Sequence, residues 1–442
     1  MELLVVVASF ALVFFAVKGG RLFYGVVPTI PGFYLVAALL PVFSVIPSIE
    51  GSDFSARVGY YDYLFAIIFH FFFFVCGVFG IYALTGFNTA ERGAFFVGGS
   101  ERFFPYKYEK KVIRAGVFLS IGIFLHQTLS LREIPFFAIF SGAYDAAEIA
   151  TLREETFKLN ESFALYFWHL NRQVLGPLLV AVFLYLHVRS PSRWSGLRFA
   201  GILAFVVINN AASSALAPVA SIFLLLLLVY LAITPRRNIG AVIVAVVLLF
   251  AFPVFVEGFF SDKTGGQLIE AVVLKIVNRF SLETFDRTLS YFDLFPYEHP
   301  YANGATNRIF AFLSGNDVFN VQNYVFLARL TELKEHLLTG NANAHFIGYM
   351  NADFGLVGVA ASSVVVGAIV GYFDVKLTRQ LPRPFALACY FLCVILFWKL
   401  MGTQPTTILV SHGAILVLLF SLYMDRRARA RNRIAPLVRH EH

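Results

Sequence analysis

The residues with the clearest chemical potential are arginines that lie beside, or inside, long apolar runs. Arg279, Arg287 and Arg329 fall in stretches with a helical spacing of apolar residues, and Arg172 stands inside "WHLNRQVLGPLL". The planar guanidinium group matches phosphate oxygens, and an arginine at membrane depth is costly unless it is paired or functional. We therefore predict that these arginines bind a phosphate-bearing group. The alternative is that they extend their charged ends to the membrane surface.

Side chains that could accept a proton lie in the same part of the sequence. His345 stands in "GNANAHFIGYM", and Asp353 follows about two helical turns later. Three carboxylates follow Arg279 along the chain: Glu283, Asp286 and Asp293. Histidine titrates near neutral pH and a desolvated carboxyl group can be raised toward it, so either type could serve as a general base. The alternatives are an interfacial histidine and an Asp353 that caps a helix or pairs with an arginine.

The elements that must position these residues are strongly apolar. Of the 442 residues, 58% are hydrophobic and only 14% are charged, whereas soluble proteins are about 25% charged. Repeated apolar runs of about 20 residues indicate transmembrane helices and argue against a large soluble helical protein.

The sequence predicts an all-α polytopic membrane protein with about eleven transmembrane helices. The predicted spans are 2–17, 30–48, 62–87, 112–130, 162–188, 198–214, 217–233, 239–257, 346–374, 385–400 and 406–424. They divide the chain into three parts. Residues 1–257 hold the first eight helices and an external loop at 131–161, residues 258–345 form a large external segment, and residues 346–442 hold the last three helices and a basic tail.

Lys and Arg concentrate in alternate loops, which sets the expected orientation. The basic loops are 18–29, 88–114, 189–198, 234–238 and 375–384, and the C-terminal tail carries "MDRRARARNR". Because cytoplasmic loops carry the excess of basic residues, this places the N-terminus and both long external segments outside the cytoplasm. The external loop at 131–161 contributes two further arginines, Arg132 and Arg153.

The segment 258–345 is too long for a structureless connection. The stretches "GGQLIEAVVLKIVNRFSLETFDRTLSYFDLF" and "VQNYVFLARLTELKEHLL" have helical spacing of apolar residues. We predict two or three short amphipathic helices that lie over the outer mouth of the bundle. In the ninth span, Ser363, Gly367 and Gly371 recur every four residues, which predicts a groove where another helix packs closely.

Three stretches together suggest a family. "NADFGLVGV…GAIVGYF" resembles the late "DFG-x-x-G" helix of Wzy-type oligosaccharide repeat-unit polymerases. "REIPFFAIFSGAYDAAEIATLREE" is similar to the first long external loop of that family, and "NRFSLETFDRTLSYFD" resembles the arginine-containing start of its large periplasmic loop. The spacing from Arg329 to Gly340 fits the family's Arg-x(10)-Gly pattern. The chain departs from the family at "NNAASSALAPVA", where many relatives carry a glycine/arginine patch.

The resemblance implies a GT-C-like glycosyltransferase of the bacterial inner membrane. Such enzymes transfer a growing glycan from undecaprenyl pyrophosphate onto the next lipid-linked repeat unit, on the periplasmic side, to build O-antigen (the polymer of lipopolysaccharide) or capsule. The expected partners are the lipid-linked oligosaccharide donor and acceptor, membrane lipid and a chain-length regulator protein, with no nucleic acid. No DxD or HExxH metal motif is present, so we expect no cofactor and metal-independent chemistry.

Under this hypothesis Arg279, Arg172 and Arg329 stabilise the departing pyrophosphate, and His345 accepts the proton of the attacking hydroxyl group. Substrate-binding contacts are expected from six other residues: Arg132, Arg153, Glu283, Arg287, Asp293 and Asp353. The nearest alternative is an O-antigen ligase or another lipid-linked glycosyltransferase. A transporter or flippase is the alternative from another class, although no internal repeat is evident and the polar residues gather on one face.

Overall fold

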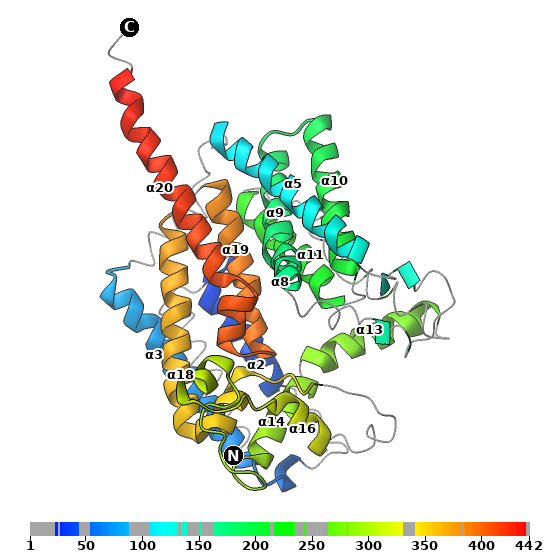
Figure 1. Ribbon diagram of the computed structural model, residues 1–442, viewed down its shortest axis with the longest axis vertical. Helices are drawn as coiled ribbons and strands as arrows, with labels where there is room; N and C mark the ends of the chain where they lie inside the picture. Colours follow the sequence, from blue (N-terminus) through cyan, green and yellow to red (C-terminus); the bar gives the residue numbers. More distant parts are fainter. Residues whose placement is uncertain are drawn as a thin grey trace. The chain divides into compact units, whose positions relative to one another are not determined.

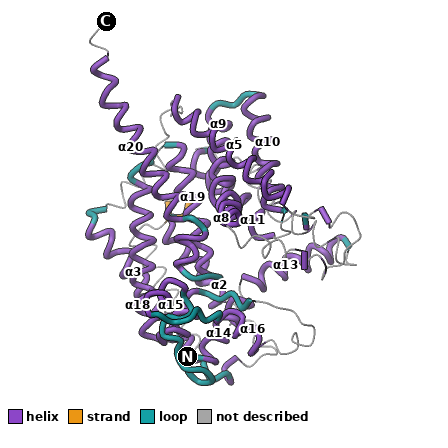
Figure 2. The backbone as a smooth tube through the Cα atoms, in the orientation of Figure 1, coloured by secondary structure: helices purple, strands orange, loops and turns teal. Residues whose placement is uncertain are grey.

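The structure is a computed structural model. It describes residues 23–24, 27–43, 54–87, 107–130, 163–212, 216–234, 264–280, 282–329, 341–381 and 383–438, with single residues between them. This part of the chain is helical apart from strands β1 (Phe23–Tyr24) and β2 (Val27–Pro28), which pair antiparallel (Figure 2). The helical fold class is therefore confirmed for the described residues. The predicted span 2–17 lies outside them, as do nearly all of the span 239–257 and the loop 131–161.

The helices up to residue 280 are α2 (Ile30–Phe43), the 3-10 helix η1 (Phe54–Ala56), α3 (Tyr60–Leu84), α5 (Lys107–Ser130), α8 (Phe163–Leu170), the π-helix η2 (Asn171–Leu175), α9 (Gly176–Arg189), α10 (Arg193–Ala211), α11 (Leu216–Ile233) and α13 (Gly265–Phe280). The later helices are α14 (Leu282–Leu294), α15 (Arg308–Ser314), α16 (Val321–Arg329), α18 (Phe346–Thr378), α19 (Pro384–Trp398), the 3-10 helix η3 (Lys399–Met401), the π-helix η4 (Thr407–Ser411) and α20 (Ala414–Val438).

Among the described residues, six helices are long and apolar enough to cross a membrane. They are Tyr60–Leu84, Glu109–Leu129, Tyr166–Arg189, Arg193–Ala211, Phe346–Thr378 and Pro384–Met401. Each coincides with one of the predicted spans, because a run of about 20 apolar residues suffices to cross the bilayer core. Two other predicted spans appear as shorter apolar helices, Ile30–Leu39 and Ala217–Ile233.

The last predicted span, 406–424, differs from the structure. It is divided at Gly413, whose φ of 77° lies in the left-handed region that interrupts a helix. A Cβ atom at this position would lie 2.8 Å from the side chain of Leu170 and 2.9 Å from that of Val174, so the turn also needs a residue without a side chain. α20 then continues through the basic residues to Val438, beyond the predicted end of the span.

The chain folds into two compact units. The first contains the described residues within 1–90, 274–375 and 396–408, and the second contains those within 91–273, 376–395 and 409–442. The first unit therefore holds α3, α14 to α16 and most of α18, and the second holds α5 and α8 to α11.

Close contact between α3 and α18 organises the first unit. A Cβ atom at Gly367 would lie 2.2 Å from the backbone oxygen of Phe74, and one at Gly77 would lie 2.2 Å from that of Val364. Gly371 similarly faces Val78. The predicted groove of small residues is confirmed, because these positions let the two backbones touch.

Residues 282–329 fold onto one end of this helix pair. Figure 1 shows α14 and α16 at the end of α3 and α18 where both helices begin. The apolar face of α14 buries Phe285, Leu289 and Phe292, and the ring of Tyr63 on α3 lies 4.9 Å from Phe285 and 5.2 Å from Phe292. Burial of these aromatic side chains fixes the segment on the apolar helices.

Candidate functional site

Arg57, just before α3, joins the start of α3 to α14. Its Nε donates to Oδ2 of Asp293 at 2.6 Å, its Nη2 donates to Ser290 Oγ at 2.9 Å, and its Nη1 pairs with Asp286. The other oxygen of Asp293 accepts the backbone N–H of Gly59 at 3.0 Å. The Asp293 side chain is only 4% exposed, so these contacts offset the cost of burying its charge.

Two of the four arginines expected to bind phosphate, Arg287 and Arg329, are paired with carboxylates in the first unit. Nη2 of Arg329 donates to Glu298 at 2.7 Å and lies 4.0 Å from Asp293. Arg287 lies 2.9 Å from Glu283, one helical turn away on α14. The structure thus brings Arg329 and Asp293 together, and a phosphate bound here would have to displace a carboxylate partner.

Asp353 holds the loop that leads to α15. Its side chain is fully buried, and it accepts the backbone N–H groups of Gly304 (3.0 Å) and Thr306 (3.1 Å) and the hydroxyl of Thr306 (2.5 Å). Gln404 donates to the Thr306 carbonyl at 3.0 Å and accepts from Asn307 at 2.8 Å. The Asp353 carboxylate therefore holds the loop 302–307 in place.

α18 is interrupted directly after this carboxylate. Gly355 has φ 65° and ψ −159°, which is not helical. The break leaves the carbonyls of Ala352 and Asp353 to accept the N–H groups of Ala302 (2.8 Å) and Asn303 (3.0 Å). The loop therefore pairs with the backbone of α18 at its break and satisfies carbonyl groups that the interrupted helix leaves without a helical partner.

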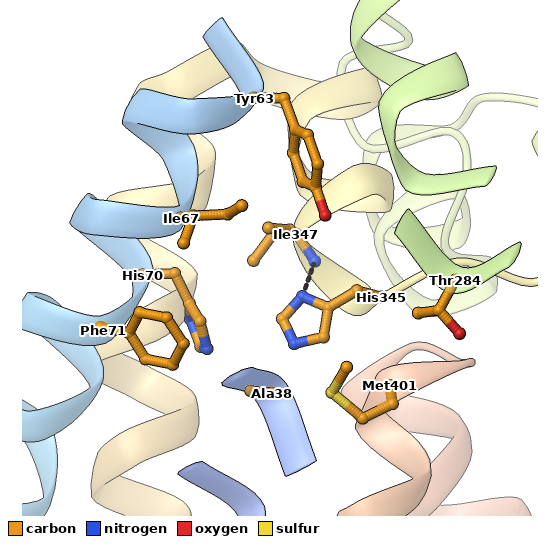
Figure 3. A pocket seen from close by; sticks show the side chains of 9 residues that line it. All are labelled: Ala38, Tyr63, Ile67, His70, Phe71, Thr284, His345, Ile347 and Met401. Atoms are coloured by element: carbon orange, nitrogen blue, oxygen red, sulfur yellow. Dashed lines mark hydrogen bonds between the residues drawn. The ribbon is translucent and has the colours of Figure 1, made fainter. Parts of the chain in front are cut away.

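His345 belongs to a buried chain of hydrogen bonds in the first unit. The Tyr34 hydroxyl on α2 lies 2.8 Å from Nε2 of His345 and 2.9 Å from Nε2 of His70 on α3. Nδ1 of His70 lies 2.9 Å from Ser363 Oγ on α18. Figure 3 shows both imidazoles beside one small pocket, which has room for about one water molecule.

The hydrogen-bond donors assign the tautomers along this chain. The Ile347 N–H points at Nδ1 of His345 at 3.5 Å, so Nε2 carries the proton of His345 and donates to Tyr34. Tyr34 then donates to Nε2 of His70, and Nδ1 of His70 donates to Ser363.

Burial lowers the pKa of His345 to about 3. The imidazole is therefore neutral, which is the form a general base needs, but its basicity is low. Proton transfer to it requires a nearby anion that stabilises the imidazolium.

Arg172 lies in the second unit, at a local change of helix type. The π-helix η2 separates α8 from α9, and such single-turn insertions are frequent at functional sites. Arg172 is only 3% exposed, and its guanidinium group donates to the carbonyl of Asn210 at 3.1 Å and lies 4.5 Å from the ring centroid of Trp168. The neighbouring Asn171 exchanges two hydrogen bonds with Ser120 on α5, at 2.6 and 3.0 Å.

Two more amide side chains of the second unit are buried. Gln127 on α5 and Asn209 on α10 have no hydrogen-bond partner for either polar atom among the described residues. Buried amides are usually satisfied by protein, water or a ligand. Together with Arg172, they make the interior of this unit unusually polar for a set of membrane-length helices.

Some predicted site residues fall outside the described residues, and others fall in different units of the fold. Arg279 lies on α13, but its side chain lies outside the described part of the structure, and so do Arg132, Arg153 and Gly340. Arg172 falls in the second unit and Arg329 in the first.

Sequence reasoning missed three residues that organise the first unit: Tyr34, Arg57 and His70. His70 and Tyr34 stand alone inside apolar runs, and an ionisable residue in such a run is itself a signal. Arg57 lies in a loop before a predicted span, and nothing near it in the sequence indicates its role, because its partners on α14 are more than 200 residues away.

The described residues form a helical protein with six helices long and apolar enough to cross a membrane and a polar segment fixed to the end of two of them. No protein-family model, curated protein or solved structure matches this chain.

Proposed function

We propose that the protein is a Wzy-type oligosaccharide repeat-unit polymerase of a bacterial inner membrane. It would transfer a glycan from undecaprenyl pyrophosphate to the next lipid-linked repeat unit at the periplasmic face. The eleven-span, GT-C-like arrangement of the whole chain and the binding of a chain-length regulator are parts of this proposal.

The observation that carries the proposal is the attachment of residues 282–329 to the start of α3 and α18. Arg57 and Asp293 hold one side of this segment, and Asp353 and Thr306 hold the other. A substrate that is half lipid and half sugar needs an ordered polar surface where apolar helices end. The order of the three family-like stretches along the sequence supports the same function.

The chemistry follows from the groups available. An acceptor hydroxyl oxygen forms a bond to the anomeric carbon, the bond from that carbon to the pyrophosphate oxygen breaks, and the hydroxyl proton passes to a base. Negative charge grows on the leaving pyrophosphate, and preplaced arginines stabilise it without reorganisation. We assign this role to Arg279 and Arg329, and that of the base to His345 or a nearby carboxylate; the role of Arg172 stays a prediction from the sequence.

Surface polysaccharide from a deletion strain, separated on a gel, tests the function. Loss of a polymerase leaves single repeat units attached to lipid A core. Loss of a ligase leaves none attached while polymer stays on the carrier, and loss of a flippase leaves neither product. A full ladder of chain lengths from the deletion strain would contradict the proposal.

A further inference from the structure

α15 presents an apolar surface that the described part of the chain leaves uncovered. Four of its apolar side chains are exposed, and Phe312 reaches 83% exposure; the others are Ile309, Phe310 and Leu313. Soluble proteins rarely leave a contiguous apolar patch of this kind open to water. A lipid environment removes that cost, as it does for short amphipathic helices in the membrane interface.

This apolar surface continues onto α18. The Phe310 ring lies 6.5 Å from that of Phe354 on α18. Phe354, Val357 and Val365 are themselves exposed along the helix. Since α18 is long and apolar enough to cross a membrane, the exposed side of α15 extends a surface that faces lipid chains.

The other side of the same surface is aromatic and polar. Tyr297 is 53% exposed, and its hydroxyl donates to Asp62 Oδ2 on α3 at 2.8 Å. Tyr301 is also exposed and covers the break in α18, because a Cβ atom at Gly355 would lie 2.8 Å from the Tyr301 hydroxyl. The hydrogen bond to Asp62 raises the pKa of Tyr297, and burial raises the pKa of Tyr301, so both phenols stay protonated.

These groups have the chemistry that recognises a sugar. An exposed aromatic ring offers a flat apolar face to sugar C–H groups. Phenol hydroxyls donate and accept hydrogen bonds, and the Asp62 carboxylate accepts from sugar hydroxyls. Because Tyr301 lies on Gly355 and Phe354 is the residue just before Gly355 on α18, the sugar-compatible side adjoins the lipid-facing side directly.

We propose that this surface binds a lipid-linked oligosaccharide at the junction between its lipid and its glycan. The side formed by α15 and Phe354 contacts the polyprenyl chain, and Tyr297, Tyr301 and Asp62 contact the first sugars. The inference rests on the proposed function and locates one of its two lipid-linked substrates on the first unit.

The test compares three probes on purified full-length protein in nanodiscs. The probes are undecaprenyl-pyrophosphate-linked repeat units extracted from the deletion strain, undecaprenyl phosphate alone, and the glycan released from the carrier by mild acid. The variants are Tyr301→Ala and Phe312→Ser. Their controls are Tyr61→Ala and Phe72→Ser, which remove an exposed tyrosine and an exposed phenylalanine from α3.

Tyr301→Ala is expected to weaken binding of the linked repeat unit and of the free glycan about tenfold. Its binding of undecaprenyl phosphate should stay unchanged. Phe312→Ser is expected to weaken binding of the linked repeat unit and of undecaprenyl phosphate. Its binding of the free glycan should stay unchanged. Both controls should bind all three probes like the wild type. If Tyr301→Ala lowers the unfolding temperature, Tyr297→Ala serves as the second variant, since its side chain is more exposed.

Wild-type binding of all three probes by both variants would overturn this site. An equal loss of binding for all three probes in Tyr301→Ala and Tyr297→Ala would also overturn the proposed site, because such a loss would indicate that the two tyrosines have only a structural role. The proposed function is tested separately, by the polysaccharide gel, and it fails if the deletion strain still makes long polymer.

Discussion

Asp353 and Thr306 are joined twice, because the buried carboxylate accepts both the backbone N–H (3.1 Å) and the hydroxyl (2.5 Å) of Thr306. Asp353 lies on α18, and Thr306 lies in the loop just before α15. This pair explains why a carboxylate stands near the start of a long apolar helix: it fixes the loop that positions α15 and Tyr301.

Asp353→Asn should loosen that loop. The amide nitrogen would face an N–H or O–H donor, and a buried donor left without an acceptor costs about 1–3 kcal/mol. We expect a lower unfolding temperature in detergent and faster proteolytic cleavage within 302–307. Asp317→Asn, on the exposed side of the next loop, is the matched control and should change neither. An unchanged unfolding temperature and cleavage rate in Asp353→Asn would contradict this prediction.

Arg57→Gln should destabilise the protein more than Arg287→Gln. Removal of Arg57 leaves Asp293 buried without its nearest cation, and because the Arg57 side chain is 24% exposed, screening reduces the cost to roughly 1–3 kcal/mol. The pair of Arg287 with Glu283 is half exposed along one helix, and it should contribute only about 0.2–0.5 kcal/mol. Thermal unfolding of both variants measures the difference, and equal shifts would contradict the assignment.

Gly355→Ala should disturb the break in α18. The φ and ψ of Gly355 suit glycine alone, so a side chain there costs about 1–3 kcal/mol of backbone strain and also meets the Tyr301 hydroxyl. Gly80→Ala on α3 is the control, because no atom lies within 4 Å of its Cβ position and helical glycine is less favourable than alanine. The unfolding temperature should fall in the first variant and hold or rise in the second.

Stability should depend on pH through His345. The pKa of this residue falls from 6.5 to about 3 in the folded protein. Below about pH 6.5 the unfolded chain binds a proton that the folded chain does not, so stability falls with falling pH by up to about 1.4 kcal/mol per unit. His345→Gln should flatten this part of the dependence, measured as unfolding temperature between about pH 8 and pH 5. An unchanged slope in His345→Gln would refute the prediction.

Arg279→Ala should abolish long-chain polymer while the protein stays in the membrane. The physical reason is the loss of a cation that stabilises the leaving pyrophosphate. A polysaccharide gel together with an immunoblot of membranes measures the two outcomes. Lys275→Ala, about one turn earlier on α13, should keep the normal ladder, and a normal ladder from Arg279→Ala would remove this residue from the catalytic machinery.

Local sequence properties predicted much of the described fold. The length of an apolar run is enough to place α3, α5, α10 and α18, because helix formation in lipid depends on satisfying the backbone within one segment. Small residues four apart predicted a groove on α18 where another helix packs, and the structure identifies that helix as α3, where Gly367 meets Phe74. Breaks were harder to predict: Gly355 and Gly413 look like other glycines in the sequence, and only their φ values set them apart.

The sequence by itself determined which segments are apolar helices, which segment between them is polar, and which charged residues stand near their ends. Only the tertiary structure decided what each charged or polar group meets: Arg57 with Asp293, Tyr34 with a histidine 311 residues away, and Asp353 with a loop hydroxyl. The reason is physical. Apolar burial follows the composition of a continuous stretch, whereas a hydrogen bond needs two specific atoms about 3 Å apart, and the folded path of the chain alone brings such distant residues together.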